Sequence, residues 1–81
     1  MDDDTLAAAV LQLALDVKPA RLTVDEMTRE LFGERASAEQ REAVVRVVGE
    51  DLAKVALLHF QREEFIEPTR AAIRYSELID R

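Results

Sequence analysis

The chain lacks cysteine and has a single histidine, two glycines and two prolines among its 81 residues. Without cysteine it has no disulfide bond and no thiolate ligand for zinc, and this suits a reducing compartment, so we expect a cytoplasmic protein. The histidine, His59, has no cysteine and no evident serine or aspartate partner in the sequence. We therefore expect no catalytic residue and no enzymatic activity.

Motifs for metals and cofactors are also missing. Asp2, Asp3 and Asp4 are adjacent acids at the start of the chain, without the glycine turn of a calcium-binding loop, so helix capping explains them better than a metal site. Neither Ser37 nor Ser76 lies in the Asp-Ser-Leu motif that carries the prosthetic group of an acyl carrier protein. The sequence predicts no metal, no cofactor and no small-molecule substrate.

Basic residues are outnumbered by acidic ones. The chain has 11 Lys and Arg against 17 Asp and Glu, which gives a net charge of -6. A field of this sign repels phosphate groups and anionic lipids. The charge therefore disfavours nucleic acid as a partner.

No apolar run is long enough to span a membrane. The run from Leu6 to Val17 is interrupted by Gln12 and Asp16 and is shorter than the ~20 residues that cross a bilayer. The head of the chain carries aspartates where an export signal requires positive charge, so we expect no signal peptide and no membrane association. With 48% hydrophobic and 35% charged residues, the composition is that of one folded soluble domain, residues 1–81.

The first segment predicts a helix that is apolar around most of its circumference. Asp4 or Thr5 caps its start, and it runs to about Lys18, because Pro19 cannot continue it. Its expected core face consists of Leu6, Val10, Leu13 and Val17.

Apolar residues extend the arc of this helix to roughly 220°, which is more than one neighbour covers in so small a domain. We therefore expect a homodimer in which a second copy of the chain covers the far side of the helix. The predicted interface residues are Ala8, Leu11 and Leu15.

A capping box predicts the second helix. Thr23 pairs with Glu26 to begin a helix of about nine residues, and Gly33 follows it as a left-handed cap. Just before it, Arg21 to Thr23 favour a short extended piece. The expected core residues of the helix are Val24, Met27, Leu31 and Phe32.

A second box, Ser37 with Gln40, begins a longer helix that runs to about Val55. Gly49 weakens this helix by ~1 kcal/mol relative to alanine, which indicates either a close backbone approach or simple tolerance. The expected core residues are Val44, Val45, Val48, Leu52 and Val55.

The last third of the chain predicts a hairpin and a final helix. Leu57 to Gln61 and Phe65 to Glu67 have the composition of short strands, and "QREE" connects them. Pro68 ends the second strand, and Thr69 caps a helix from Arg70 to about Ile79. The side chains expected in the core from this region are Leu58, Phe60, Phe65, Ile66, Ala71, Ala72, Tyr75, Leu78 and Ile79.

Three stretches, "RLTVDEMTRELFG", "AEQREAVVRVVGEDLAKVALLH" and "EFIEPTRAAIRYSEL", resemble a family of small, mostly uncharacterised winged helix-turn-helix proteins of actinobacteria. The likeness covers about residues 6 to 78. Two departures are Ala56, where the family usually has a helix-ending glycine, and the absence of glycine from "QREE". The resemblance implies an α+β, mainly α fold: a three-helix core, a two-stranded β-hairpin wing and a C-terminal helix. It also implies DNA binding in transcription.

In such a motif the second helix enters the major groove and the wing contacts the backbone or the minor groove. The outward face expected for that helix carries three acids and two bases, so it is not net positive. The candidate nucleic-acid contacts are Arg35, Gln40, Arg41, Arg46, Lys54 and Arg62. The main hypothesis is therefore a non-enzymatic module for protein interaction and dimerisation, with an unknown protein partner in a regulatory complex. The alternative is a DNA-binding transcriptional regulator that uses helix 37–55 and the 57–67 wing.

Overall fold

The computed structural model describes residues 2–61 and 65–79, which form four α-helices, one π-helical segment and one antiparallel sheet. The elements are α1 (Asp3–Asp16), β1 (Leu22–Thr23), α2 (Val24–Phe32), α3 (Ala38–Arg46), η1 (Val47–Leu52), β2 (Leu58–Gln61), β3 (Phe65–Pro68) and α4 (Arg70–Ile79). The predicted class, α+β and mainly helical, is confirmed.

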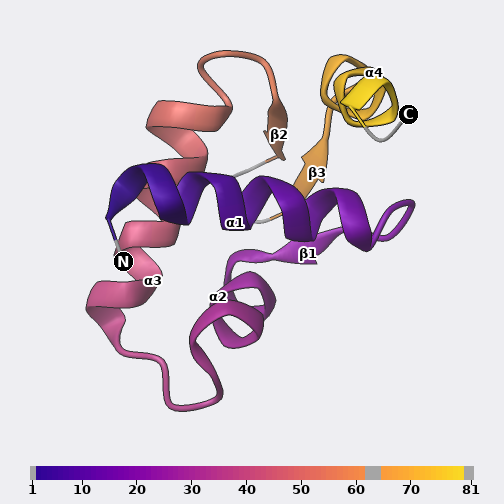
Figure 1. Cartoon of the computed structure of the whole chain (residues 1–81). Coiled ribbons are helices and arrows are strands. Elements are labelled where there is room, and N and C mark those ends of the chain that lie inside the picture. The colour runs from indigo at the N-terminus through magenta and orange to yellow at the C-terminus, as the bar shows by residue number, and fades with distance from the viewer. Residues whose placement is uncertain (1, 62–64, 80–81) are drawn as a thin grey trace.

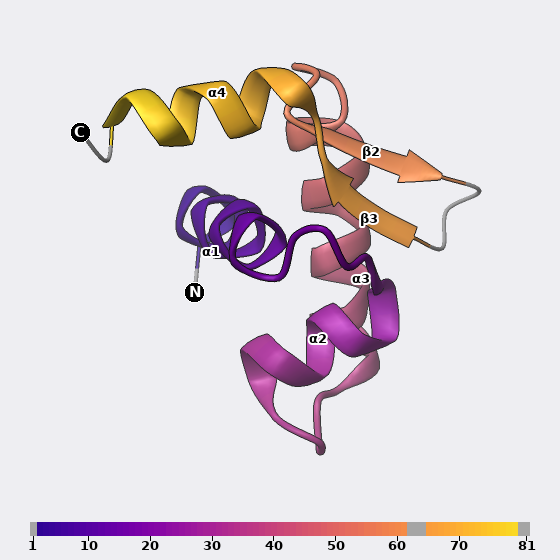
Figure 2. The same ribbon diagram turned by 90° about the vertical axis from the view of Figure 1, so that its right-hand side faces the viewer.

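Helix α1 runs across the middle of the molecule, with α2 and α3 on one side of it and α4 on the other (Figures 1 and 2). Figure 1 shows α1 lengthwise and α4 end-on, and Figure 2 shows the reverse, so these two helices cross. The sheet has the order β1-β3-β2, because Ile66 in the central strand pairs with Leu22 on one side and Phe60 on the other. The predicted hairpin is thus confirmed, and the extended piece before α2 adds a third strand.

The core lies where α1, α2, α3 and the sheet meet, and each of these elements contributes fully buried side chains. Those from the helices are Leu6, Val10, Val24, Met27, Val44, Val47 and Val48, and those from the strands are Leu58 and Ile66. Phe32 and Phe60 are partly buried and pack against this cluster, in agreement with their prediction as core aromatics.

Helix starts follow the predicted capping chemistry closely. Thr23 accepts a hydrogen bond from the Glu26 amide at 3.1 Å, and the Glu26 side chain accepts one from the Thr23 amide at 3.0 Å. The Ser37 and Gln40 box is equally complete. The first helix is capped by Asp2, which accepts from the Thr5 amide at 2.8 Å, and not by Asp4 or Thr5 as predicted.

The third helix departs from its predicted core stripe in its second half. From Val47 onward it is π-helical, and the amide of Ala53 donates to the carbonyl of Val48, five residues earlier, at 2.8 Å. A wider turn rotates the following residues away from the positions that a 3.6-residue period gives them. Val48 and Leu52 are buried as predicted, and Val47, three positions after Val44 on the same side of the helix, is also buried. Val55, predicted to be in the core, lies beyond the end of η1 and is 63% exposed.

The chain reverses after η1 at Ala56, which has a φ of 60°, the left-handed region. The Ala56 amide donates to the Ala53 carbonyl at 3.1 Å, and the Leu57 amide donates to the Leu52 carbonyl at 2.9 Å. These two bonds satisfy carbonyls at the helix end and form a Schellman motif with alanine at the position that glycine usually occupies. Gly33, predicted as a left-handed cap, ends α2 with a positive φ of 89°, but its ψ of 174° is extended, so it differs from a left-handed helical residue.

Three predicted core positions near the C-terminus are wrong. Tyr75 is 62% exposed, Leu78 is 68% exposed, and Ala71 is also exposed, because α4 crosses α1 and only Ala72 in it is fully covered. The side chain of Ile79 lies outside the described residues. Phe65 is only partly buried, since it lies on the opposite sheet face from Ile66, with the Arg21 guanidinium 4.7 Å from its ring centroid.

Candidate functional site

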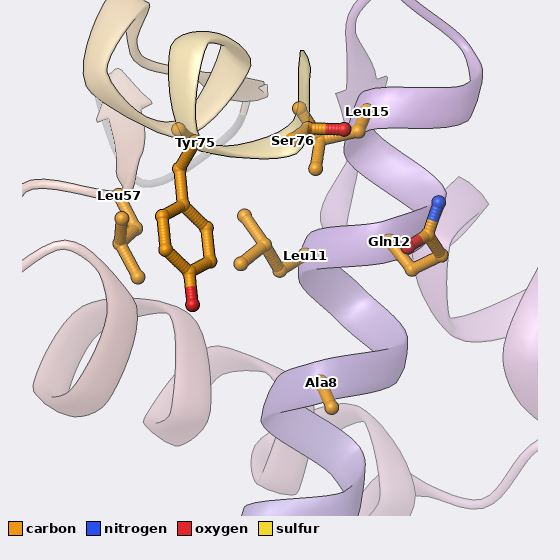
Figure 3. Close-up of a pocket in the computed structure, with 8 residues that line it drawn as sticks. Ala8, Leu11, Gln12, Leu15, Leu57, Tyr75 and Ser76 are labelled. Atoms are coloured by element: carbon orange, nitrogen blue, oxygen red, sulfur yellow. The ribbon is translucent and has the colours of Figure 1, made fainter. Parts of the chain in front are cut away.

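An apolar groove between α1 and α4 is one of several concave features of the described surface and is distinguished by its apolar lining. Its volume is about 230 Å³, and residues from both helices and from the loop before β2 line it (Figure 3). They are Ala8, Leu11, Gln12, Leu15, Leu57, Ala72, Tyr75 and Ser76. All three residues that the sequence predicted for a dimer interface thus line one groove.

The first helix supplies one wall because its apolar arc is wider than the part of it that the core covers. Leu6, Val10 and Ala14 are buried on the core side. Leu11 and Leu15 lie on the adjacent side and are only partly buried, and Ala8 is exposed. The apolar surface that remains after the core has formed is the wall of the groove.

The second wall depends on how the last helix is anchored. The Thr69 hydroxyl donates to the Ala56 carbonyl at 2.7 Å and accepts from the Ala72 amide at 3.2 Å. The Thr69 amide donates to the Leu57 carbonyl at 3.1 Å. These bonds cap α4 as predicted and fix its first turn against the reversal at Ala56. In Figure 3, the Tyr75 ring consequently hangs from α4 between Leu57 and Leu11.

The groove has the chemistry of a surface that binds apolar side chains. Its polar groups are Gln12, whose amide donates to Asp16 at 2.8 Å, and the hydroxyls of Tyr75 and Ser76. Its lining includes no Asp, Glu, Lys, Arg or His side chain. Elsewhere, among residues 2–61 and 65–79, no cluster of three or more His, Asp or Glu side chains has the arrangement to hold a metal ion.

The candidate nucleic-acid contacts are partly engaged within the chain. Arg46 makes a bidentate pair with Asp3, with nitrogen to oxygen distances of 2.9 and 3.3 Å. Arg41 pairs with Asp25 at 2.7 Å. The Gln40 side chain is engaged in its capping box.

The other candidate contacts are less constrained. Arg35 and Lys54 are exposed and form no ion pair within the described part of the chain. Arg62, predicted at the tip of the hairpin, lies outside the described residues.

Hydrogen bonds shift the titration of the Arg46 pair. The Arg46 side chain donates to Asp3 and holds the pKa of that carboxyl below its ordinary value. The same bond raises the pKa of Arg46, and the nearby Glu50 and Asp51 add to this effect. Both partners are therefore charged at neutral pH, so the pair cancels a positive charge on the outer face of α3.

The sequence did not indicate which residues would meet its predicted interface. Leu57 lies just after the reversal at Ala56, and Tyr75 was predicted to be in the core. Their proximity to Leu11 depends on the crossing of α1 and α4, for which no residue pattern provides a signal. Asp3 was considered as a cap, and its pairing with Arg46 spans 43 positions of sequence.

Within the described residues, none of the helices combines the length and the apolar character needed to cross a membrane. Comparison with protein-family models, with curated proteins and with solved structures finds no match.

Proposed function

We propose that the chain is a winged helix-turn-helix domain in which α2 and α3 form the motif and the β2–β3 hairpin forms the wing. The order of the elements supports this assignment, because two capped helices are followed directly by an antiparallel hairpin and a further helix. The positive φ of Ala56 also supports it, since the resembling family places a helix-ending glycine there. The fold alone does not define the function.

The function that the geometry supports best is protein interaction. The chain acts as a non-enzymatic dimerisation module in a regulatory complex, with a second copy of the chain and a further protein as its partners. The observation that carries this proposal is the apolar groove between α1 and α4, because soluble proteins seldom leave a hollow apolar surface uncovered unless something binds to it.

The charges on α3 support the same proposal. Each phosphate contact on duplex DNA requires a Lys or Arg, and specific binders commonly neutralise ~6 to 10 phosphates. Here Arg41 and Arg46 are paired with carboxylates, and Glu39, Glu42 and Glu50 are exposed nearby. A helix with this balance of charge is a poor surface for a polyanion.

DNA binding by α3 and the hairpin is the second candidate, favoured by the order of the elements and by the exposed Arg35 and Lys54. Titration of a labelled random-sequence duplex at ~50 mM salt separates the two, with fluorescence anisotropy as the readout. We expect no binding at micromolar protein. Salt-sensitive binding that Arg46→Ala or Lys54→Ala weakens would reverse the ranking of the two functions.

The role of α1 in dimerisation is tested by sedimentation of Ala8→Glu. Ala8 is exposed, so the substitution leaves the fold intact, which circular dichroism verifies, while it places a charge in the groove. We expect a dimeric wild type and a monomeric Ala8→Glu. Thr5→Glu, which adds the same charge on the polar side of α1, is the matched control and stays dimeric. A monomeric wild type, or a dimeric Ala8→Glu, contradicts dimerisation through this helix.

A further inference from the structure

Two uncovered apolar surfaces lie on neighbouring parts of the molecule. One is the groove between α1 and α4. The other is an apolar ridge on α4 itself, formed by Leu78 and by Tyr75, which also lines the groove; they are 68% and 62% exposed. These residues are three positions apart, so they lie one above the other on a single side of the helix. Leu78 does not line the groove of its own chain.

The groove has room for the side chains of such a ridge. A cavity of roughly 150 Å³ with an apolar lining holds a benzene ring. The groove, with about 230 Å³, is larger than this and is open to solvent on one side. Tyr75 is already one of its lining residues, and an aliphatic side chain such as Leu78 from a partner helix fits the space beside it.

The charges of the two helices are complementary. Helix α1, with its cap, carries four aspartates and no base; Asp3 is already paired with Arg46, and the other three are Asp2, Asp4 and Asp16. Over the described residues, α4 carries Arg70 and Arg74 against a single acid, Glu77. No ion pair joins the two helices within residues 2–61 and 65–79. The attraction between an acidic α1 and a basic α4 is therefore available to a second molecule.

We propose that the ridge on α4 of a second copy occupies the groove, and that the contact is reciprocal. This inference rests on the proposed function, since it specifies how the dimer forms. A two-fold symmetric interface uses the same patch on both subunits, and a patch that contains both a groove and a ridge is complementary to itself. A second copy covers the groove and Leu78 together, and it brings a basic α4 to an acidic α1.

Leu78→Glu tests the ridge without disturbing the monomer, because Leu78 is mostly exposed. We expect the dissociation constant of the dimer, measured by analytical ultracentrifugation, to rise at least tenfold, since a charge replaces a central apolar contact. The melting temperature at low protein concentration stays unchanged. Glu77→Gln, at the adjacent position on the other side of α4, leaves the dimer intact.

Mixing two variants tests reciprocity. Leu11→Lys damages the groove and keeps the ridge, whereas Leu78→Glu damages the ridge and keeps the groove. In a reciprocal dimer, the mixture restores one apolar contact and brings the introduced carboxylate of one copy against the introduced ammonium group of the other. We expect the equimolar mixture to form a heterodimer, although each variant alone is monomeric. If circular dichroism shows that Leu11→Lys is unfolded, Ala8→Lys takes its place, because Ala8 is exposed.

The other outcomes overturn the inference in distinguishable ways. A dimeric Leu78→Glu together with a monomeric Leu11→Lys shows that copies associate through α1 without α4, so the inference fails and the proposed dimerisation stands. A mixture that remains monomeric excludes reciprocity. A wild type that is monomeric at high micromolar concentration removes both the inference and dimerisation, whereas DNA binding through α3 would overturn the proposed function alone.

Discussion

Replacing Ala56 by glycine is expected to stabilise the protein. With a φ of 60°, Ala56 is in the left-handed region, where the Cβ atom of an L residue crowds the backbone at a cost of roughly 1–2 kcal/mol. Glycine removes this cost but gives the unfolded chain more freedom, worth about 0.4–1 kcal/mol. The midpoints of these two ranges leave a net gain of about 0.8 kcal/mol in the free energy of unfolding.

Urea denaturation and thermal melting measure this gain. For a domain of this size, 1 kcal/mol raises the melting temperature by roughly 4–8 °C. The slope of the free energy against urea should stay constant, because the surface exposed on unfolding does not change.

Both natural glycines serve as internal controls for Ala56→Gly. Gly33→Ala should destabilise the protein, since Gly33 has a φ of 89°. Gly49→Ala should stabilise it by up to about 1 kcal/mol, because Gly49 is helical and a Cβ atom there meets nothing within 4 Å. If Ala56→Gly is neutral or destabilising while Gly49→Ala stabilises, the chain does not reverse through a left-handed residue at position 56.

Thr69→Val should lower the free energy of unfolding, measured by urea denaturation, by about 1–2 kcal/mol. The substitution removes the buried cap of α4 and leaves the Ala56 carbonyl with one hydrogen bond fewer. Thr69→Ser, which keeps the hydroxyl, should retain most of the stability. The Arg46 pair should make stability depend on pH: the pKa of Asp3 is depressed by folding, so its contribution is complete above the ordinary value of 3.8 and is lost as pH falls through the folded pKa. Asp3→Asn should therefore lose less stability than the wild type between about pH 5 and pH 2, and equal losses would show that the pair does not stabilise the fold.

The features predicted correctly from the sequence are those determined by residues close together along the chain. The boxes at Thr23 and Ser37 each need a partner only three positions away, and both form completely. The same applies to the Thr69 cap and to the end of α2 at Gly33. The hairpin was predictable because two short runs with the composition of strands are separated by the polar residues "QREE", and Pro68 ends the second run.

The errors arise where a distant contact determines the geometry. A helical wheel with a fixed period cannot represent the π-helical segment or the end of the helix at Leu52, and so it placed Val55 in the core. The wheel also treated α4 as an ordinary surface helix that buries a full stripe. Because α4 crosses α1, that stripe has little to pack against beyond its first turn, and Tyr75 and Leu78 remain exposed.

For the candidate site, the sequence predicted one wall and could not predict the other. Ala8, Leu11 and Leu15 were identified because the apolar arc of α1 exceeds what a small core covers. The residues that complete the groove come from the loop before β2 and from α4, and their approach is determined by the reversal at Ala56 and by the Thr69 bonds. Neither feature is a binding motif, since each provides hydrogen bonds to backbone groups that a helix end would otherwise leave without a partner.

The direction of α4 thus connects the stability of the chain to its proposed association. The Thr69 hydroxyl donates to the Ala56 carbonyl and the Thr69 amide donates to the Leu57 carbonyl, and Leu57 in turn lines the groove. A change that loosens this anchor leaves the main core intact, because its fully buried side chains belong to α1, α2, α3, η1 and the sheet. It displaces the wall of the groove and the Tyr75–Leu78 ridge together. Thr69→Val should therefore change the free energy of dimerisation more than it changes the free energy of unfolding.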